Sequence, residues 1–162
     1  MSTASWTGVK AILRTRLLAF SPTGGGTTLA ARLGSTSTGS GSDGKLFHDQ
    51  APDNLTGLWA VLRIIDAPVT GFDGGFLIHA TAELILYGRP RKMAAQVEAA
   101  ADVAMEAWHD YSYSESGGHL STQDVTNRFT VPYQEPADRE LVAVRLLLPF
   151  RVSPIFLTRY AA

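Results

Sequence analysis

Hydrophobic residues recur every three or four positions in the first part of the chain, which is typical of an amphipathic helix. Residues 5 to 20 repeat this spacing from Trp6 to Phe20 and leave Lys10 and Arg14 off the apolar side. The stretch therefore predicts a first helix that packs one face against a core.

The same spacing returns later, in the stretch "RPRKMAAQVEAAADVAMEAWHDY". Pro90 fits the first position of a helix, where a missing backbone donor is tolerated. The predicted apolar stripe consists of Met93, Val97, Ala100, Ala104 and Trp108. We expect a second main helix here.

Four other stretches alternate or run apolar in the manner of β-strands. They cover residues 58–66, 78–87, 125–133 and 141–152. The link between the first two makes them a plausible hairpin. Because Pro149 lacks a backbone donor, we expect the last strand to end, bulge or lie at a sheet edge near this residue.

These elements predict one α+β domain spanning residues 1–162. The expected order is α-β-β-α-β-β, with an antiparallel sheet of about four strands and two main helices on one face. Residues 34–44, "GSTSTGSGSDG", have no apolar side chain and are expected to form a flexible insert.

Composition narrows the function classes. The 162 residues include 14 basic and 15 acidic side chains and no cysteine. This balance disfavours generic nucleic-acid binding, which uses a basic excess, and the absence of cysteine fits synthesis in a reducing compartment. Arg14 and Arg16 interrupt the apolar N-terminal stretch, so we expect neither a signal peptide nor a membrane span.

The glycine-rich stretch "SPTGGGTTLAARLG" raises the question of a phosphate site. A phosphate-binding loop of the Walker type needs a preceding strand and a lysine beside Ser or Thr, and both are missing. The dinucleotide pattern G-x-G-x-x-G fails at Leu29. We interpret the stretch as a connector in which Thr27 or Thr28 caps a short helical turn that Gly34 ends.

Other candidate chemistry is sparse. His48 and Asp49 are adjacent, so an extended chain would point them to opposite faces. His79 and Glu83 share a strand face but would need a third ligand to hold a metal. His119 is expected in a solvated Gly/Ser loop. We therefore predict no catalytic residues, no metal site and no cofactor.

The order of several segments carries a resemblance to a known family. The helix "VKAILRTRLLAF", the segment "TLAARLG" and "KLFHDQAPDN" before the strand "LWAVLRIID" resemble the tail terminator (tail completion) proteins of long-tailed bacteriophages. So do "ATAELILYGRPRKMAAQVEAAADVAMEAW" and the closing "NRFTVPYQEPADRELVAVRLLLPFRV". The "FHDQAP" turn is the most specific of these features, and the long insert departs from the family's usual compactness.

The resemblance implies a structural protein of the virion, made in the host cytoplasm, with no enzymatic activity. Its copies would form a homohexameric ring on the last ring of the tail tube. The ring would stop tube polymerisation and provide the head–tail joining surface at the neck. The implied partners are the major tail tube protein and a head completion or connector protein. DNA would pass through the ring lumen without sequence-specific binding.

Charged residues are the candidates for contacts between subunits, because charge complementarity fixes partner and register. The candidates are Arg63, Glu83, Arg89, Arg91, Arg128, Glu140, Arg145 and Arg151. A second candidate surface is the flexible insert, represented by Gly34, Ser37, Gly39, Gly41, Asp43 and Gly44.

Two alternatives stay open at this point. A head completion or connector adaptor of the neck would share this composition but would bind on the portal side. A small enzyme or ligand-binding α+β domain using His79, Glu83 and a loop histidine is the other alternative, and the missing catalytic set weighs against it.

Overall fold

The computed structural model describes residues 6–34, 45–53, 55–66, 77–115, 117–125, 127–130 and 140–159. Its helices are α1 (Thr7–Ala19), α2 (Leu29–Leu33), α3 (Ala94–Trp108) and α4 (Pro154–Arg159), with a 3-10 turn η1 (Arg91–Met93) before α3. Its strands are β1 (Leu46–His48), β2 (Gly57–Asp66), β3 (Ile78–Arg89), β4 (Ser112–Glu115), β5 (Gly118–Thr122), β6 (Asn127–Thr130) and β7 (Val142–Val152).

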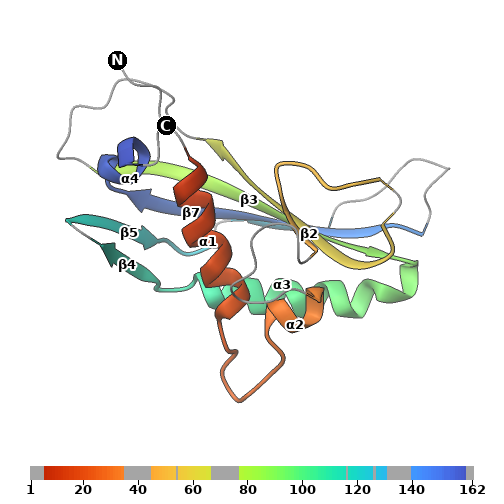
Figure 1. Ribbon diagram of the computed structural model, residues 1–162. Helices are drawn as coiled ribbons and strands as arrows, with labels where there is room; N and C mark the ends of the chain where they lie inside the picture. The colour runs from red at the N-terminus through yellow and green to blue at the C-terminus, as the bar shows by residue number, and fades with distance from the viewer. Residues whose placement is uncertain are drawn as a thin grey trace.

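The strands form one twisted, mixed sheet (Figure 1). The strand order is β1-β2-β3-β7-β5-β4, and β6 pairs with a different part of β7. β1 runs parallel to β2, whereas every other pairing is antiparallel. β3 and β7 pair over their whole length, from Ile78↔Val152 to Gly88↔Val142, and form the centre of the sheet.

The predicted fold class was wrong. A four-stranded antiparallel sheet in the order α-β-β-α-β-β does not describe the mixed sheet of seven strands with four helices that the described residues form. The prediction missed β1, which has three residues, and the β4–β5 hairpin, whose strands have four and five residues. Such short strands carry too few alternating positions to be detected, and parallel pairing depends on contacts distant in sequence.

The pairing of the two long predicted strands was correct. β2 and β3 form an antiparallel pair in which Arg63 lies opposite Glu83 and Trp59 opposite Tyr87. A register shift between Ile64 and Asp66 adds local irregularity at the end of β2. Residues 67–76, which link the two strands, lie outside the described part of the chain, as do 131–139 of the predicted third strand and its following turn.

Pro149 does not end β7, contrary to expectation. The strand continues to Val152 inside the sheet. On the side away from β3, β6 pairs with β7 up to Leu147, and β5 begins its pairing at Phe150. Pro149 therefore sits at the junction between two partner strands, where a missing donor breaks no ladder. Its carbonyl accepts hydrogen bonds from the Gln123 amide and from Trp108 Nε1.

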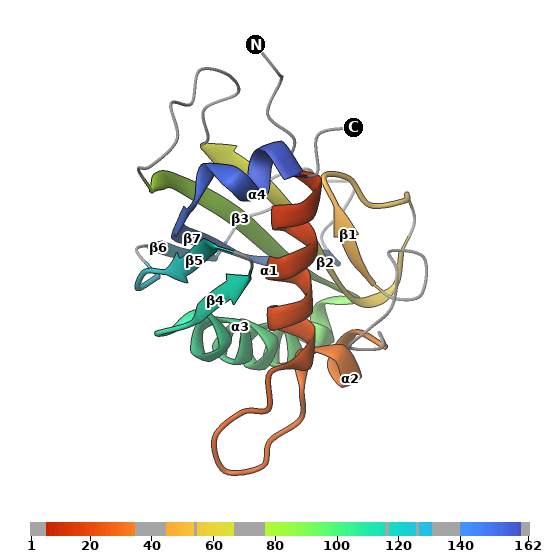
Figure 2. The same cartoon turned by 60° about the vertical axis from the view of Figure 1, so that its left-hand side comes forward.

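The helices contact one face of the sheet, where the hydrophobic core lies. α3 packs on β3 and β7, while α1 and α2 pack on β2 (Figure 2). Phe150 of β7 meets Trp6 before α1 and Trp108 of α3 in edge-to-face contacts. Gly88 lets η1 and α3 approach β3, because a Cβ there would lie 2.6 Å from Val97.

The local signals for the helices were confirmed in part: Pro90 precedes the 3-10 turn η1, and α3 begins only at Ala94. The predicted stripe of α3 is buried from Val97 to Trp108, and Met93 is partly buried against it. Thr28 accepts a hydrogen bond from Ala31 N at 3.1 Å and caps α2, which Gly34 ends with φ 68°. Arg14 is an exception, because it is 5% exposed although the pattern placed it off the apolar side.

Candidate interaction surface on the open sheet face

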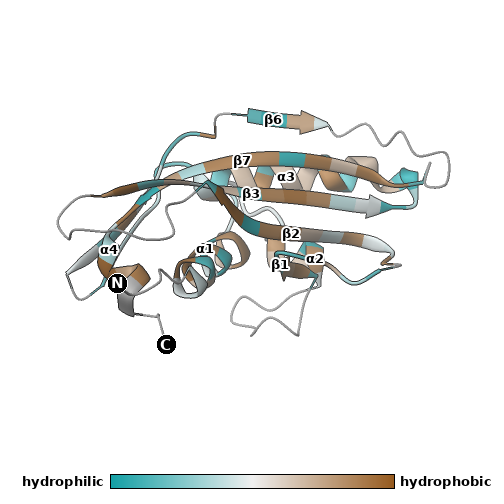
Figure 3. Cartoon of the chain, turned by 90° about the horizontal axis from the view of Figure 1, so that it is seen from above, coloured by the Kyte–Doolittle hydropathy of each residue, from teal (hydrophilic) through white to brown (hydrophobic). Residues whose placement is uncertain are grey.

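One face of the central strands carries no described helix. Side chains of a strand alternate between the two faces, and the even-numbered residues of β2, β3 and β7 point into the helix-covered core. The odd-numbered residues from Trp59 to Arg63, from His79 to Arg89 and from Ala143 to Arg151 lie on the other side. We call this side the open sheet face; in Figure 3 the view falls on it, with α3 behind β3 and β7.

A buried carboxylate stands at the centre of the open sheet face. Glu83 is only 1% exposed, and its Oε1 accepts a hydrogen bond from Arg63 Nε at 2.5 Å. Its Oε2 accepts from Arg145 Nε. Arg63 lies directly opposite Glu83, and Arg145 lies diagonally across on β7, opposite Ile85. The three side chains therefore join three neighbouring strands through one carboxylate.

The electrostatics of this triad follow from its charges. The hydrogen bond from Arg63 to Glu83 raises the pKa of the Arg63 guanidinium, which stays charged. One carboxylate cannot balance two guanidinium groups, so the triad carries a net positive charge. The side chains of Arg63 and Arg145 are 47% and 35% exposed, and both present donors to solvent.

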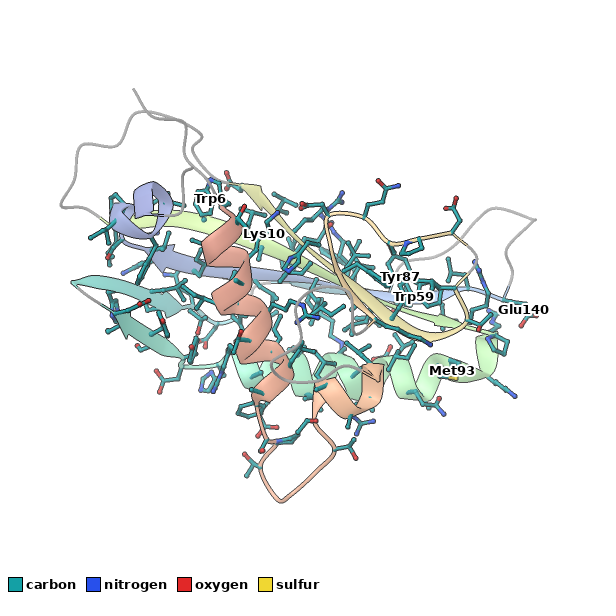
Figure 4. The ribbon with its side chains drawn as sticks, in the orientation of Figure 1. Trp6, Lys10, Trp59, Tyr87, Met93 and Glu140 are labelled. Atoms are coloured by element: carbon teal, nitrogen blue, oxygen red, sulfur yellow. The ribbon has the colours of Figure 1, made fainter. Side chains whose placement is uncertain are left out.

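Aromatic groups flank the triad on the same face. Trp59 and Tyr87 stack with ring centroids 5.3 Å apart and lie side by side in Figure 4. The guanidinium of Arg89 lies 5.7 Å from the Trp59 ring centroid, and Arg89 Nη1 also donates to Leu55 O. Phe129 of β6 is 43% exposed, and Arg145 lies over its ring at 5.8 Å.

The structure brings five of the eight predicted interface residues onto this face. They are Arg63, Glu83, Arg89, Arg145 and Arg151, the last exposed at the end of β7. Arg128 lies on the helix side instead, where it donates to Asp102 at 2.6 Å and also to Glu98. These two carboxylates raise the pKa of Arg128.

The other two predicted residues meet each other. The backbone amide of Arg91 donates to Glu140 Oε2 at 3.2 Å, close to where β7 begins. Of the candidate loop residues, Gly34 is the end cap of α2, and Ser37, Gly39, Gly41, Asp43 and Gly44 lie outside the described residues.

The structure also places the residues that were weighed for metal binding. Glu83 is engaged by two arginines, whereas His79 is exposed opposite Arg151. Within the described ranges, no group of three or more His, Asp or Glu side chains could hold a metal ion. His119 lies on β5 rather than in a loop, and its Nδ1 is 3.0 Å from Ser114 Oγ across the β4–β5 hairpin.

A second surface feature lies between α1 and β4. Gly8, Ala11, Ile12 and Thr15 of α1 and two tyrosines, Tyr111 and Tyr113, line a cavity of about 220 Å³. Arg16 lies over the Tyr111 ring at 4.4 Å and donates to Ala107 O at 2.7 Å. Burial raises the pKa of Tyr111, so its hydroxyl stays protonated at neutral pH.

Sequence reasoning missed the aromatic part of the open sheet face. The alternation of the strands places Trp59 on the same side as Arg63 and Tyr87 on the same side as Glu83, so the signal was present. Phe129 could be placed only once the register of β6 on β7 was known.

Comparisons with known proteins add no relative. No protein-family model matches the chain, and no curated protein sequence matches it. In the described part of the chain, every helix is too short or too polar to cross a membrane.

Proposed function

We propose that this chain is a structural protein of a long-tailed phage that forms a ring on the head-proximal end of the tail tube. The ring would stop tube polymerisation and offer its other face to the head completion or connector protein. In this proposal the chain acts in the virion neck, has no catalytic activity, and DNA passes through the ring lumen without sequence-specific binding.

The observation that carries the proposal is the open sheet face together with the order of segments that resembles the tail terminator family. The face joins exposed Phe129 to arginines that present donors, and enrichment in aromatic residues and arginine characterises protein–protein interfaces. A tube grows by repeated head-to-tail contacts and stops when one ring presents a face that templates no further subunit. Termination then requires interfaces only.

The proposal is tested by adding the purified chain to polymerising subunits of the matching tail tube protein and measuring tube lengths by electron microscopy. We expect tubes that shorten as the proportion of the chain rises, with one ring at one end. Bovine serum albumin at the same concentration serves as the control. Unchanged lengths with the chain free in solution would contradict the proposal. Capture by the connector instead would favour the neck-adaptor alternative.

A further inference from the structure

The charges of the domain separate onto two opposite faces. The register shift at the end of β2 places Asp66 opposite Thr81 and so adds it to the open sheet face. On this face, β2, β3 and β7 carry four arginines against the carboxylates of Glu83 and Asp66, which makes a net charge of +2. The arginines are Arg63, Arg89, Arg145 and Arg151.

The exposed side of α3 has the opposite sign. From Ala94 to Trp108 the helix contains Glu98, Asp102 and Glu106 and no basic residue. Arg128 of β6 offsets one of these charges, so α3 and Arg128 together, which we call the acidic helix face, have a net charge of −2. The three carboxylates follow one another at intervals of four residues and therefore form one stripe along the helix.

The shapes of the two faces also suit each other. Ala95 and Ala99 share the stripe of the acidic helix face and are exposed or half-exposed, so a neighbour can approach the helix closely. On the open sheet face Trp59, Glu83 and Ala143 are buried, whereas Arg63, His79 and Arg151 are exposed, and exposed Phe129 lies beside them. A helix packed on a sheet is one of the common layer arrangements of proteins.

We propose that the acidic helix face of one copy docks on the open sheet face of the next copy. Because α3 and the open sheet face lie on opposite sides of the same sheet (Figure 1), the contact joins two different surfaces. Each added copy therefore leaves the growing assembly with one free surface of each kind. Such a head-to-tail contact closes into a ring when its rotation permits. The inference rests on the ring of the proposed function and names the two faces that build it.

The test uses charge reversal on exposed or half-exposed positions outside the buried triad. A sheet variant, His79→Glu with Arg151→Glu, changes the formal charge of the open sheet face from +2 to −1 when histidine is counted as uncharged. A helix variant, Asp102→Lys with Glu106→Lys, changes the acidic helix face from −2 to +2. Arg32→Glu on α2 controls for an arginine reversal elsewhere, and Thr23→Ala controls for the lost contact between Thr23 and Glu106.

Ring formation is measured by native mass spectrometry and sedimentation at equal protein concentrations, with circular dichroism confirming the fold. Each double variant alone should assemble at least about tenfold more weakly than the wild type, because it juxtaposes faces of like sign. An equal mixture should recover rings in which the two variants alternate, since every contact then joins opposite charges. The two controls should assemble like the wild type.

The outcomes separate this inference from the proposed function. If each variant alone forms rings as well as the wild type does, these two faces do not dock on each other, and a tail terminator ring would have to form through other surfaces. A wild-type chain that stays monomeric would overturn both. Salt-sensitive binding of a DNA duplex that the sheet variant loses, with ring formation intact, would assign the open sheet face to nucleic acid and overturn the inference.

Discussion

Arg63 Nε lies 2.5 Å from Glu83 Oε1, directly across the β2–β3 pair and on the face of the sheet that no described helix covers. Glu83 is nevertheless 1% exposed, and Arg145 donates to its other oxygen from β7. The carboxylate thus holds two arginines at fixed places on the open sheet face. This arrangement positions positive charge on β2 and β7, the two strands that flank β3.

Replacing Glu83 by Gln should destabilise the domain by about 1–3 kcal/mol, because two guanidinium groups lose a charged acceptor and keep only partial access to water. Urea unfolding followed by circular dichroism measures the loss. Glu98→Gln is the matched control, since Glu98 pairs with Arg128 at a more exposed position and should cost under about 1 kcal/mol. Equal losses of unfolding free energy in the two variants would show that the buried triad stabilises the domain no more than the exposed pair does.

Replacing Trp108 by Phe should lower stability by about 1–3 kcal/mol, because the fully buried indole fills the core and its Nε1 donates to Pro149 O at 2.9 Å. Thermal unfolding gives the change. Trp6→Phe is the control: Trp6 Nε1 is buried with no hydrogen-bond partner among the described groups, so its loss should cost less. A larger effect at Trp6 would contradict this assignment.

Replacing Gly88 by Ala should cost about 1–3 kcal/mol, because the new Cβ would lie 2.6 Å from Val97 Cγ2 and 2.8 Å from Met93 Cβ. The expected result is a lower midpoint in urea with an unchanged slope. Gly26→Ala, whose Cβ would meet only Pro22 at ordinary distances of 3.4 Å or more, should leave the midpoint nearly unchanged. An unchanged midpoint for Gly88→Ala would mean that η1 and α3 do not approach β3 this closely.

Acidification should destabilise the domain through His48. Burial, followed by the charges of Lys10 and Arg14, lowers the pKa of this imidazole below its ordinary value of 6.5. Below pH 6.5 the unfolded chain protonates His48 more readily than the folded chain does. The domain therefore has its full stability, as far as His48 is concerned, above about pH 6.5, and the free energy of unfolding falls as the pH drops towards the lowered pKa.

Melting temperatures measured from pH 8 to pH 5 test this effect. His48→Gln removes the titrating group and should reduce the loss of stability between pH 6.5 and pH 5. His79→Gln, at an exposed position on the open sheet face, should leave that loss as it is in the wild type. Identical pH profiles for the wild type and His48→Gln would contradict the role of His48.

Periodicity in the sequence predicted the elements that are long enough to repeat their pattern. α1, α3 and the β2–β3 pair each show several turns or alternations, and each was found. β1 and the β4–β5 hairpin are too short, and the mixed sheet topology depends on contacts that no local pattern encodes. Arg14 shows a further limit, because it is 5% exposed although the helical pattern placed it off the apolar side.

The charged residues of the candidate surface could be predicted from the sequence, but their arrangement could not. The sequence pointed to Arg63, Glu83 and Arg145 as charged candidates on strands. Only the register shows that Glu83 stands between the two arginines, and only the pairing of β6 with β7 brings Phe129 beside Arg145. Arg128 belongs to the opposite side of the sheet because its strand neighbour, Leu146, faces the core.

The central claim is that a ring of this chain caps the tail tube, and it can be measured on preformed tubes. Tubes are incubated with the chain, washed and supplied with fluorescently labelled tube subunits, and growth at each end is scored by microscopy. The proposal predicts that one end of each tube stops accepting labelled subunits while untreated tubes keep growing. Labelled growth at the same rate on treated and untreated tubes would contradict it.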